Sequence, residues 1–249
     1  MRRTRQRKAR NIIFTKSPLI QIKQLKNGSS CFVVDDFCLK PDLWIELAQQ
    51  NHADFRASSS ADNVGYPGIE LTMPDLINNS LTEFFIQYIR PRMNSRRVIY
   101  STSRLAMVTL PEDQLRPAQS ICHRDLAREP GGIMTASVLY LFKDANKGGT
   151  SFYAPKKSHS ETMALVQDSL SMSAEAFHQR YGIAQRYLLG SNEYFDQIGS
   201  VEAKWNRIVF YDGDIYHSAD ILQPKTLSAD PTQGRLTLNG FFYCTKKAG

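Results

Sequence analysis

The sequence has no long apolar run and few cysteines. No stretch approaches the roughly 18 consecutive apolar residues that a membrane-spanning helix needs. Four cysteines occur in 249 residues, and no two of them have C-x-x-C spacing. Cysteines without such spacing, in apolar surroundings, are typical of buried free thiols in a reducing compartment. We therefore expect a cytoplasmic protein without a membrane segment.

No acidic residue precedes Asp35 in the sequence. Residues 1–17 are predicted to form a flexible basic leader. The chain has a formal charge of +7, and without the six cations at residues 2–10 the remainder has a charge of +1. Such a leader can be merely solvated, can meet nucleic acid, anionic lipid or an acidic partner, or can act as an organellar transit peptide. No apolar run after it is long enough for a signal-peptide core.

The rest of the chain has the composition of a globular domain. It is 42% hydrophobic and 10% aromatic, which is enough for one large core, so residues 18–249 are predicted to form a single domain. Amphipathic or capped patterns predict N-terminal helices at 41–48 and 80–89. Residues 56–74 are rich in Ser, Asn, Gly and Pro and predict a long loop.

Strand patterns dominate the second half. They occur at 98–110, 133–143, 207–211 and 235–244, whereas residues 158–200 predict a helical insertion between strands. Strands in the second half with helices mostly before them favour an α+β fold with a mainly β core. The expected architecture is a barrel or jelly roll buttressed by N-terminal helices.

Three residues have the chemistry of a metal centre: His123 and Asp125 in an H-x-D motif, and His217 further on. Two imidazoles and one carboxylate can occupy one face of an octahedral Fe(II), as in non-haem oxygenases. His123 and Asp125 lie two residues apart, so on an extended segment they point to the same side. An H-x-D motif alone is weak support, since this composition produces an H-x-D/E motif by chance in about every second chain.

The order of further motifs strengthens this interpretation. After His123-Arg124-Asp125 come the strand 137–141, the segment 148–152 with Gly-Gly-Thr, the pair Phe210-Tyr211 before His217, and the segment 234–237 with Gly-Arg-Leu-Thr. Over about residues 30–245 the chain resembles the 2-oxoglutarate-dependent Fe(II) dioxygenases. It is most similar to the prolyl 4-hydroxylase-like branch and to an uncharacterised bacterial group of relatives.

The resemblance implies a double-stranded β-helix in which His123, Asp125 and His217 form the catalytic Fe(II) site. It implies 2-oxoglutarate as co-substrate and O2 as oxidant, with hydroxylation coupled to release of succinate and carbon dioxide. Arg235 would anchor the distal carboxylate of 2-oxoglutarate and Thr237 would add a hydroxyl. Arg207 is the reserve anchor. Tyr140 would either hydrogen-bond the co-substrate or pack in the core.

Other functions fit fewer of these features. A non-catalytic cupin-like protein that binds a metal or ligand is the main alternative, and a zinc hydrolase could also use two histidines and a carboxylate. The start of a kinase catalytic loop matches residues 123–126, but Pro130 replaces the metal-binding Asn, and the chain contains no G-x-G-x-x-G loop and no D-F-G. The remaining histidines, His52, His159 and His178, are expected to lie outside the metal site.

The substrate is expected to be a peptide, an amino acid or a small metabolite. The loop 56–74 and the insertion 158–200 would flank the mouth of the site and determine which substrate binds. Six residues would suit an acidic or peptide-like substrate: Arg56, Tyr66, Arg124, Arg128, Lys156 and Lys157. Nucleic acid is expected only through the basic leader, and the sequence does not determine an oligomeric state.

Overall fold

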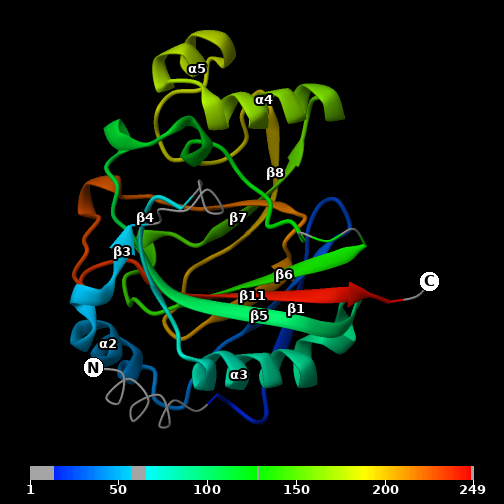
Figure 1. The fold of residues 1–249 in the computed structure, drawn as a ribbon, viewed down its shortest axis with the longest axis vertical. Coiled ribbons are helices and arrows are strands. Elements are labelled where there is room, and N and C mark those ends of the chain that lie inside the picture. Colours follow the sequence, from blue (N-terminus) through cyan, green and yellow to red (C-terminus); the bar gives the residue numbers. More distant parts are fainter. Residues whose placement is uncertain (1–13, 58–65, 128, 130, 248–249) are drawn as a thin grey trace.

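The computed structural model describes residues 14–57, 66–127, 129 and 131–247. Most of the predicted leader, part of the predicted loop 56–74, and the positions Arg128 and Pro130 lie outside the described residues. The described chain folds around two antiparallel sheets that face each other (Figure 1).

The larger sheet has eight strands in the order β1-β2-β9-β6-β11-β5-β4-β3. Every neighbouring pair in it is antiparallel. Its strands are β1 (Ile20–Gln24), β2 (Ser30–Val34), β3 (Arg56–Ala57), β4 (Gly68–Thr72), β5 (Ser95–Val108), β6 (Gly132–Tyr140), β9 (Ile208–Asp212) and β11 (Leu236–Lys246).

The smaller sheet has three strands in the order β10-β7-β8, again antiparallel. These strands are β7 (Thr150–Pro155), β8 (Phe195–Val201) and β10 (Tyr216–Ala219). Two facing antiparallel sheets with helices packed outside them confirm the predicted mainly β jelly roll.

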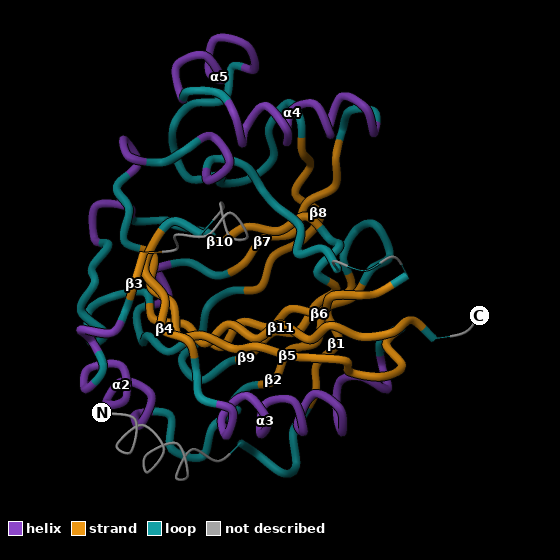
Figure 2. Tube along the Cα trace, in the orientation of Figure 1, coloured by secondary structure: helices purple, strands orange, loops and turns teal. Residues whose placement is uncertain are grey.

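Helices cover the outside of both sheets (Figure 2). The α-helices are α2 (Asp42–Gln50), α3 (Asp75–Phe84), α4 (His159–Ser171) and α5 (Ala174–Tyr181), and a π-helical turn, Phe85–Ile89, continues α3. Short 3-10 turns lie at His52–Asp54, Arg90–Arg92, Glu112–Gln114, Pro117–Gln119, Ala145–Lys147 and Pro224–Thr226. Ser158 and Ser173 cap α4 and α5 through their side-chain oxygens, as capping preferences lead one to expect.

The alternation of side chains along the strands separates two cores. Leu238 and Phe242 of β11 face outward and pack with Trp44 of α2 and Leu81 of α3. Tyr140, Phe152 and other residues fill the space between the two sheets. Because successive strand residues point to opposite faces, the positions of β11 between these outward residues face the interior, where the site lies.

Two sequence-based boundaries were wrong. The predicted loop 56–74 contains β3 and β4, which extend the large sheet at its edge. The predicted helical insertion 158–200 is helical only as far as Tyr181, and Phe195–Val201 pairs with β7 as a strand. In both cases sheet pairing decided the conformation of a segment whose local pattern was weak.

Two expectations from composition can be compared with the structure. All four cysteines are buried and unpaired, as predicted. Among the described residues, no helix is both long and apolar enough to cross a membrane.

The outer core should dominate stability. Phe242 is fully buried, and its ring stacks on Phe85 with centroids 4.3 Å apart. We expect Phe242→Ala to lower the free energy of unfolding by about 3–5 kcal/mol, since it removes a large buried ring and leaves a cavity. Urea unfolding followed by circular dichroism measures this. The control Leu19→Ala, at a position 78% exposed, should change it by less than about 0.5 kcal/mol, and equal midpoints for both variants would contradict the assignment.

Candidate metal centre and its cavity

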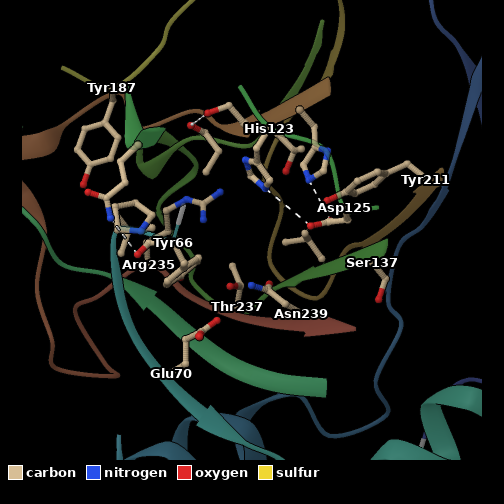
Figure 3. Close-up of a pocket in the computed structure, with 18 of the residues that line it drawn as sticks. Tyr66, Glu70, His123, Asp125, Ser137, Tyr187, Tyr211, Arg235, Thr237 and Asn239 are labelled. Atoms are coloured by element: carbon tan, nitrogen blue, oxygen red, sulfur yellow. Dashed lines mark hydrogen bonds and ion pairs between the residues drawn. The ribbon is translucent and has the colours of Figure 1, made fainter. Parts of the chain in front are cut away.

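The structure brings His123, Asp125 and His217 together, and one donor atom from each lies within 4.8 Å of the others. Nε2 of His217 lies 3.3 Å from Oδ2 of Asp125, and Nε2 of His123 lies 4.0 Å from Oδ1. The two imidazole rings are 4.4 Å apart between centroids. Figure 3 shows the side chain of His123 directed toward that of Asp125.

Backbone hydrogen bonds hold these segments in register. The N–H of His123 donates to the carbonyl of His217 at 3.0 Å, and the N–H of His217 donates back at 2.8 Å. Asp125 donates its N–H to the carbonyl of Gly213 at 2.8 Å. A Cβ on Gly213 would lie 2.6 Å from the Asp125 carbonyl oxygen, so only glycine permits this approach.

The tautomer of His217 leaves its metal-facing nitrogen free. Nδ1 lies 2.8 Å from the carbonyl of Ile215, and since a carbonyl only accepts, Nδ1 carries the proton. Nε2 then presents its lone pair toward Asp125. A metal-binding imidazole that donates its other N–H to a carbonyl is the usual arrangement in metalloproteins.

Electrostatics keep the donors in metal-binding protonation states. Burial raises the pKa of Asp125, but the nearby His217, His123 and Arg104 outweigh it, so that this pKa lies below its ordinary value. Although 47% of the His123 side chain is exposed, burial of the ring, followed by the nearby His217, lowers its pKa to about 4. At neutral pH the centre therefore holds one carboxylate and a neutral His123.

The donor set fits a divalent metal ion. Cis ligands about 2.1 Å from an ion lie about 3 Å from each other. The Asp125–His217 pair is already close to that spacing. The donor nitrogen of His123 must come about 1–2 Å closer, since it lies 4.0 Å from Asp125 and the three donor atoms span up to 4.8 Å. Two imidazoles and one carboxylate on one side leave the other side of an octahedral ion open.

The centre lies in the wall of a cavity of about 100 Å³ between the two sheets. One water occupies roughly 10–15 Å³ in this measure, so the cavity has room for a small molecule. Its lining includes residues from both sheets and from the connecting segments: Tyr66, Pro67, Glu70, Val108, Gln119, Ile121, Ser137, Val138, Thr150, Tyr187, Tyr211, Ser218, Ala219, Arg235, Thr237, Asn239 and Phe241, besides the three donors.

Arg235 lies buried at the opposite side of this cavity from the metal donors (Figure 3). Its Nε donates to the carbonyls of Lys147 and Gly148 at 3.2 Å, and its Nη2 donates to that of Gly149 at 2.7 Å. A Cβ on Gly149 would lie 1.9 Å from the Val201 carbonyl oxygen. The glycine pair therefore allows the close approach that turns its carbonyls toward Arg235.

The other predicted co-substrate residues lie in different places. Thr237 lines the cavity beside Arg235. Tyr140 is fully buried behind the lining, where its hydroxyl lies 2.8 Å from Oγ1 of the cavity-lining Thr150. The reserve anchor Arg207 forms a two-point ion pair with Asp35 and does not line the cavity.

Two buried polar atoms in the cavity lining have no hydrogen-bond partner within the described chain: the hydroxyl of Tyr66 and Oδ1 of Asn239. Buried polar atoms are nearly always hydrogen-bonded. Unpartnered atoms in a cavity wall are consistent with a polar ligand or water in that cavity.

A family model described as "Family of unknown function (DUF6445)" matches residues 16–242. The chain belongs to the DUF6445 family. A comparison with the curated proteins gave no match.

Several solved structures are similar to this DUF6445 chain. The epimerase SnoN from nogalamycin biosynthesis, a non-haem α-ketoglutarate-dependent enzyme, is 10% identical with a TM-score of 0.48, over 98% of this chain and 84% of that chain. The carbocyclase SnoK from the same biosynthesis is 13% identical with a TM-score of 0.49, over 89% and 81% of the two chains. A prolyl-4-hydroxylase of Pseudomonas putida is 10% identical with a TM-score of 0.40, over 89% and 90%.

Sequence reasoning missed several cavity residues. Asn239 and Phe241 line the cavity because they continue the alternation that begins at Arg235 and Thr237, and a period of two along that strand would have found them. Glu70 and Tyr187 come from segments without a motif. Only the tertiary fold brings those two to the site.

Of the six residues expected to suit a substrate, Tyr66 alone among those described lines the cavity. Arg124 pairs with Asp214 and covers the ring of Tyr216, and Lys157 pairs with Glu193. Arg56 and Lys156 donate to backbone carbonyls elsewhere. Of the other histidines, His52 and His178 contact backbone carbonyls and His159 begins α4, so none of the three joins the centre.

The lowered pKa of His123 should make the metal-free protein sensitive to acid. Between the ordinary value of about 6.5 and the folded value of about 4, the unfolded chain takes up a proton that the folded one does not. Stability should therefore fall as pH decreases through this window. We expect His123→Gln to reduce the loss of thermal stability between pH 6.5 and pH 4.5, measured in EDTA. An unchanged pH slope in the variant would show that His123 is not the titrating group.

Proposed function

We propose that this DUF6445 protein is a non-haem Fe(II)- and 2-oxoglutarate-dependent oxygenase of hydroxylase type. The observation that carries the proposal is one cavity with a two-histidine, one-carboxylate donor set on one side and a buried arginine on the other. Such a donor set is typical of Fe(II) oxygenases. With Fe(II) and 2-oxoglutarate bound, the centre would activate O2 and oxidise a C–H bond of the substrate.

His123, Asp125 and His217 would hold the metal. The backbone bonds between the two histidine segments fix two of the donors before metal arrives, and the contact of Nδ1 of His217 with the carbonyl of Ile215 assigns Nε2 as the metal-binding nitrogen. Such preorganisation lowers the cost of assembling the site. The buried Tyr211, whose ring lies 4.7 Å from that of His217, excludes water from one side of this imidazole.

Arg235 would bind the distal carboxylate of 2-oxoglutarate. Three backbone carbonyls orient its guanidinium through Nε and Nη2, and Nη1 has no hydrogen-bond partner in the described part of the chain. A buried guanidinium recognises carboxylates strongly through charge-assisted hydrogen bonds. The hydroxyls of Thr237 and Tyr66 would donate to the same carboxylate, and Tyr140 would position Thr150 from behind the lining.

Visible absorbance of the metal-free protein, titrated without oxygen, tests this proposal. Addition of Fe(II) and then 2-oxoglutarate should produce a weak charge-transfer band that needs both. We expect Arg235→Gln to raise the half-saturating 2-oxoglutarate concentration by about tenfold or more, since a hydrogen bond to a charged group contributes about 1.5–3 kcal/mol. His123→Ala should abolish the band.

Arg207→Gln is the matched control, because it removes an arginine that pairs with Asp35 outside the cavity. It should leave the 2-oxoglutarate titration unchanged within about twofold. Tight metal binding without a band would favour a cupin-like metal-binding protein or a zinc site. Failure to bind any divalent metal would refute the centre itself.

A further inference from the structure

The interior face of β11 continues beyond the cavity. Thr237, Asn239 and Phe241 line the cavity at every second position, and Tyr243 follows two residues further on the same face. Tyr243 lies opposite Tyr100 of β5 in the strand register. Their rings stack with centroids 4.9 Å apart and an interplanar angle of 29°. By strand geometry the pair begins about 7 Å from Phe241.

This tyrosine pair is rigid and keeps one ring open. A Cβ on Gly132 of β6 would lie 2.3 Å from the ring of Tyr243, so this ring lies flat across the glycine backbone. Tyr243 is only 7% exposed, whereas Tyr100 is 42% exposed. The ring of Tyr100 rests on the buried ring of Tyr243 and is partly exposed. Such a ring can stack on a planar ligand at little cost in conformational entropy.

A cluster of cations gathers at the end of the sheet beyond the tyrosine pair, with Arg90 and Arg92 on the outer-core side and the others at or just after the strand ends. Its members come from the 3-10 turn after α3 and from the paired ends of β5 and β11: Arg90, Arg92, Arg96, Arg97, Lys246 and Lys247. Hydrogen bonds hold them together, since Arg90 donates to the carbonyl of Arg96 and Lys247 to that of Pro91. We call these six residues the basic cluster.

The basic cluster has little compensation by acids. No ion pair to any of its members occurs among the described residues. The acidic groups that act nearby are Asp212, which interacts with Lys246, and Glu129, which interacts with Tyr243. Without the leader cations the whole chain carries only +1, so the excess of positive charge here is local.

We propose that the tyrosine pair and the basic cluster bind single-stranded nucleic acid, with a base stacked on Tyr100 and phosphates bound by the cluster. Single-strand binding combines a positively charged surface with aromatic rings on which bases stack. Six cations suit several phosphates in a row. A duplex hides the faces of its bases. The aspartate and glutamate side chains of an acidic peptide have no aromatic ring that could stack on Tyr100.

This surface does not depend on the metal centre. Binding requires neither Fe(II) nor 2-oxoglutarate, so failure of the proposed oxygenase activity leaves the binding proposal intact, and the reverse also holds. Only the further step, that a bound strand is a substrate because the pair adjoins the cavity, would rest on the proposed function.

Fluorescence anisotropy of a labelled ten-nucleotide RNA or DNA strand with the full-length metal-free protein tests the proposal. We expect Tyr100→Ala to weaken binding by about fivefold or more, since stacking contributes roughly 1–3 kcal/mol per base. Tyr100→Phe should retain the wild-type affinity because it keeps the ring. Unchanged thermal unfolding of both variants shows that the fold is intact.

A charge-matched pair of double variants tests the basic cluster. Arg96→Ala with Arg97→Ala removes two of its cations, and Lys23→Ala with Lys40→Ala removes two exposed cations from other surfaces. The first should reduce the slope of log affinity against log salt by about 1.4, since each phosphate contact contributes about 0.7 for single strands. The second should leave that slope unchanged.

Three results would overturn the proposal. The first is no binding by the wild-type protein at low salt. The second is failure of the variants to discriminate, as equal loss in both double variants or as no effect of Tyr100→Ala, which would assign binding to overall charge or to the leader. The third is competition by a free mononucleotide or by polyglutamate as effective as that by the unlabelled strand, which would make the ligand a small nucleotide or an acidic peptide.

Discussion

The site depends on the pair of backbone hydrogen bonds between His123 and His217. These residues are far apart in the sequence, and the isolated bridge between them brings the segment of Asp125 against the strand of His217. That bridge links the H-x-D segment to strand β10, so all three donors belong to one connected region. Because Gly213 then accepts from the Asp125 amide, the carboxylate is placed by main-chain geometry, and the side chains need little further adjustment.

The opposite side of the cavity is organised by a different constraint. The Gly148-Gly149 turn approaches two neighbouring segments so closely that any Cβ would collide with a backbone carbonyl. This approach turns three carbonyls toward Arg235 and allows a guanidinium to be buried with its Nε and Nη2 hydrogen-bonded. Charge is expensive to bury without such partners, so the glycines make the arginine possible.

The large sheet links these two regions to the exposed surface. The residues of β11 alternate between the outer core and the interior. Arg235 therefore directly precedes a strand that carries the cavity-lining Asn239 and Phe241 and the stacked Tyr243. Because side chains alternate along a strand, the proposed anchor Arg235, the cavity-lining residues and Tyr243 follow one another on the interior face. The same strand stabilises the fold through Phe242.

The sequence by itself determined the fold class and the free thiols, and it predicted three residues that the structure brings together, His123, Asp125 and His217, because alternating strands and an ordered series of motifs are local patterns. Tertiary structure alone decided that residues 195–201 form a strand. It also decided that Arg207 forms an ion pair with Asp35 while Arg235 lines the cavity. The same holds for Tyr66, Glu70 and Tyr187, which line the cavity. Tertiary structure also decided that Tyr100 and Tyr243 stack on each other near the end of the sheet. These outcomes depend on which strands pair and in what register, and such long-range contacts leave no local pattern.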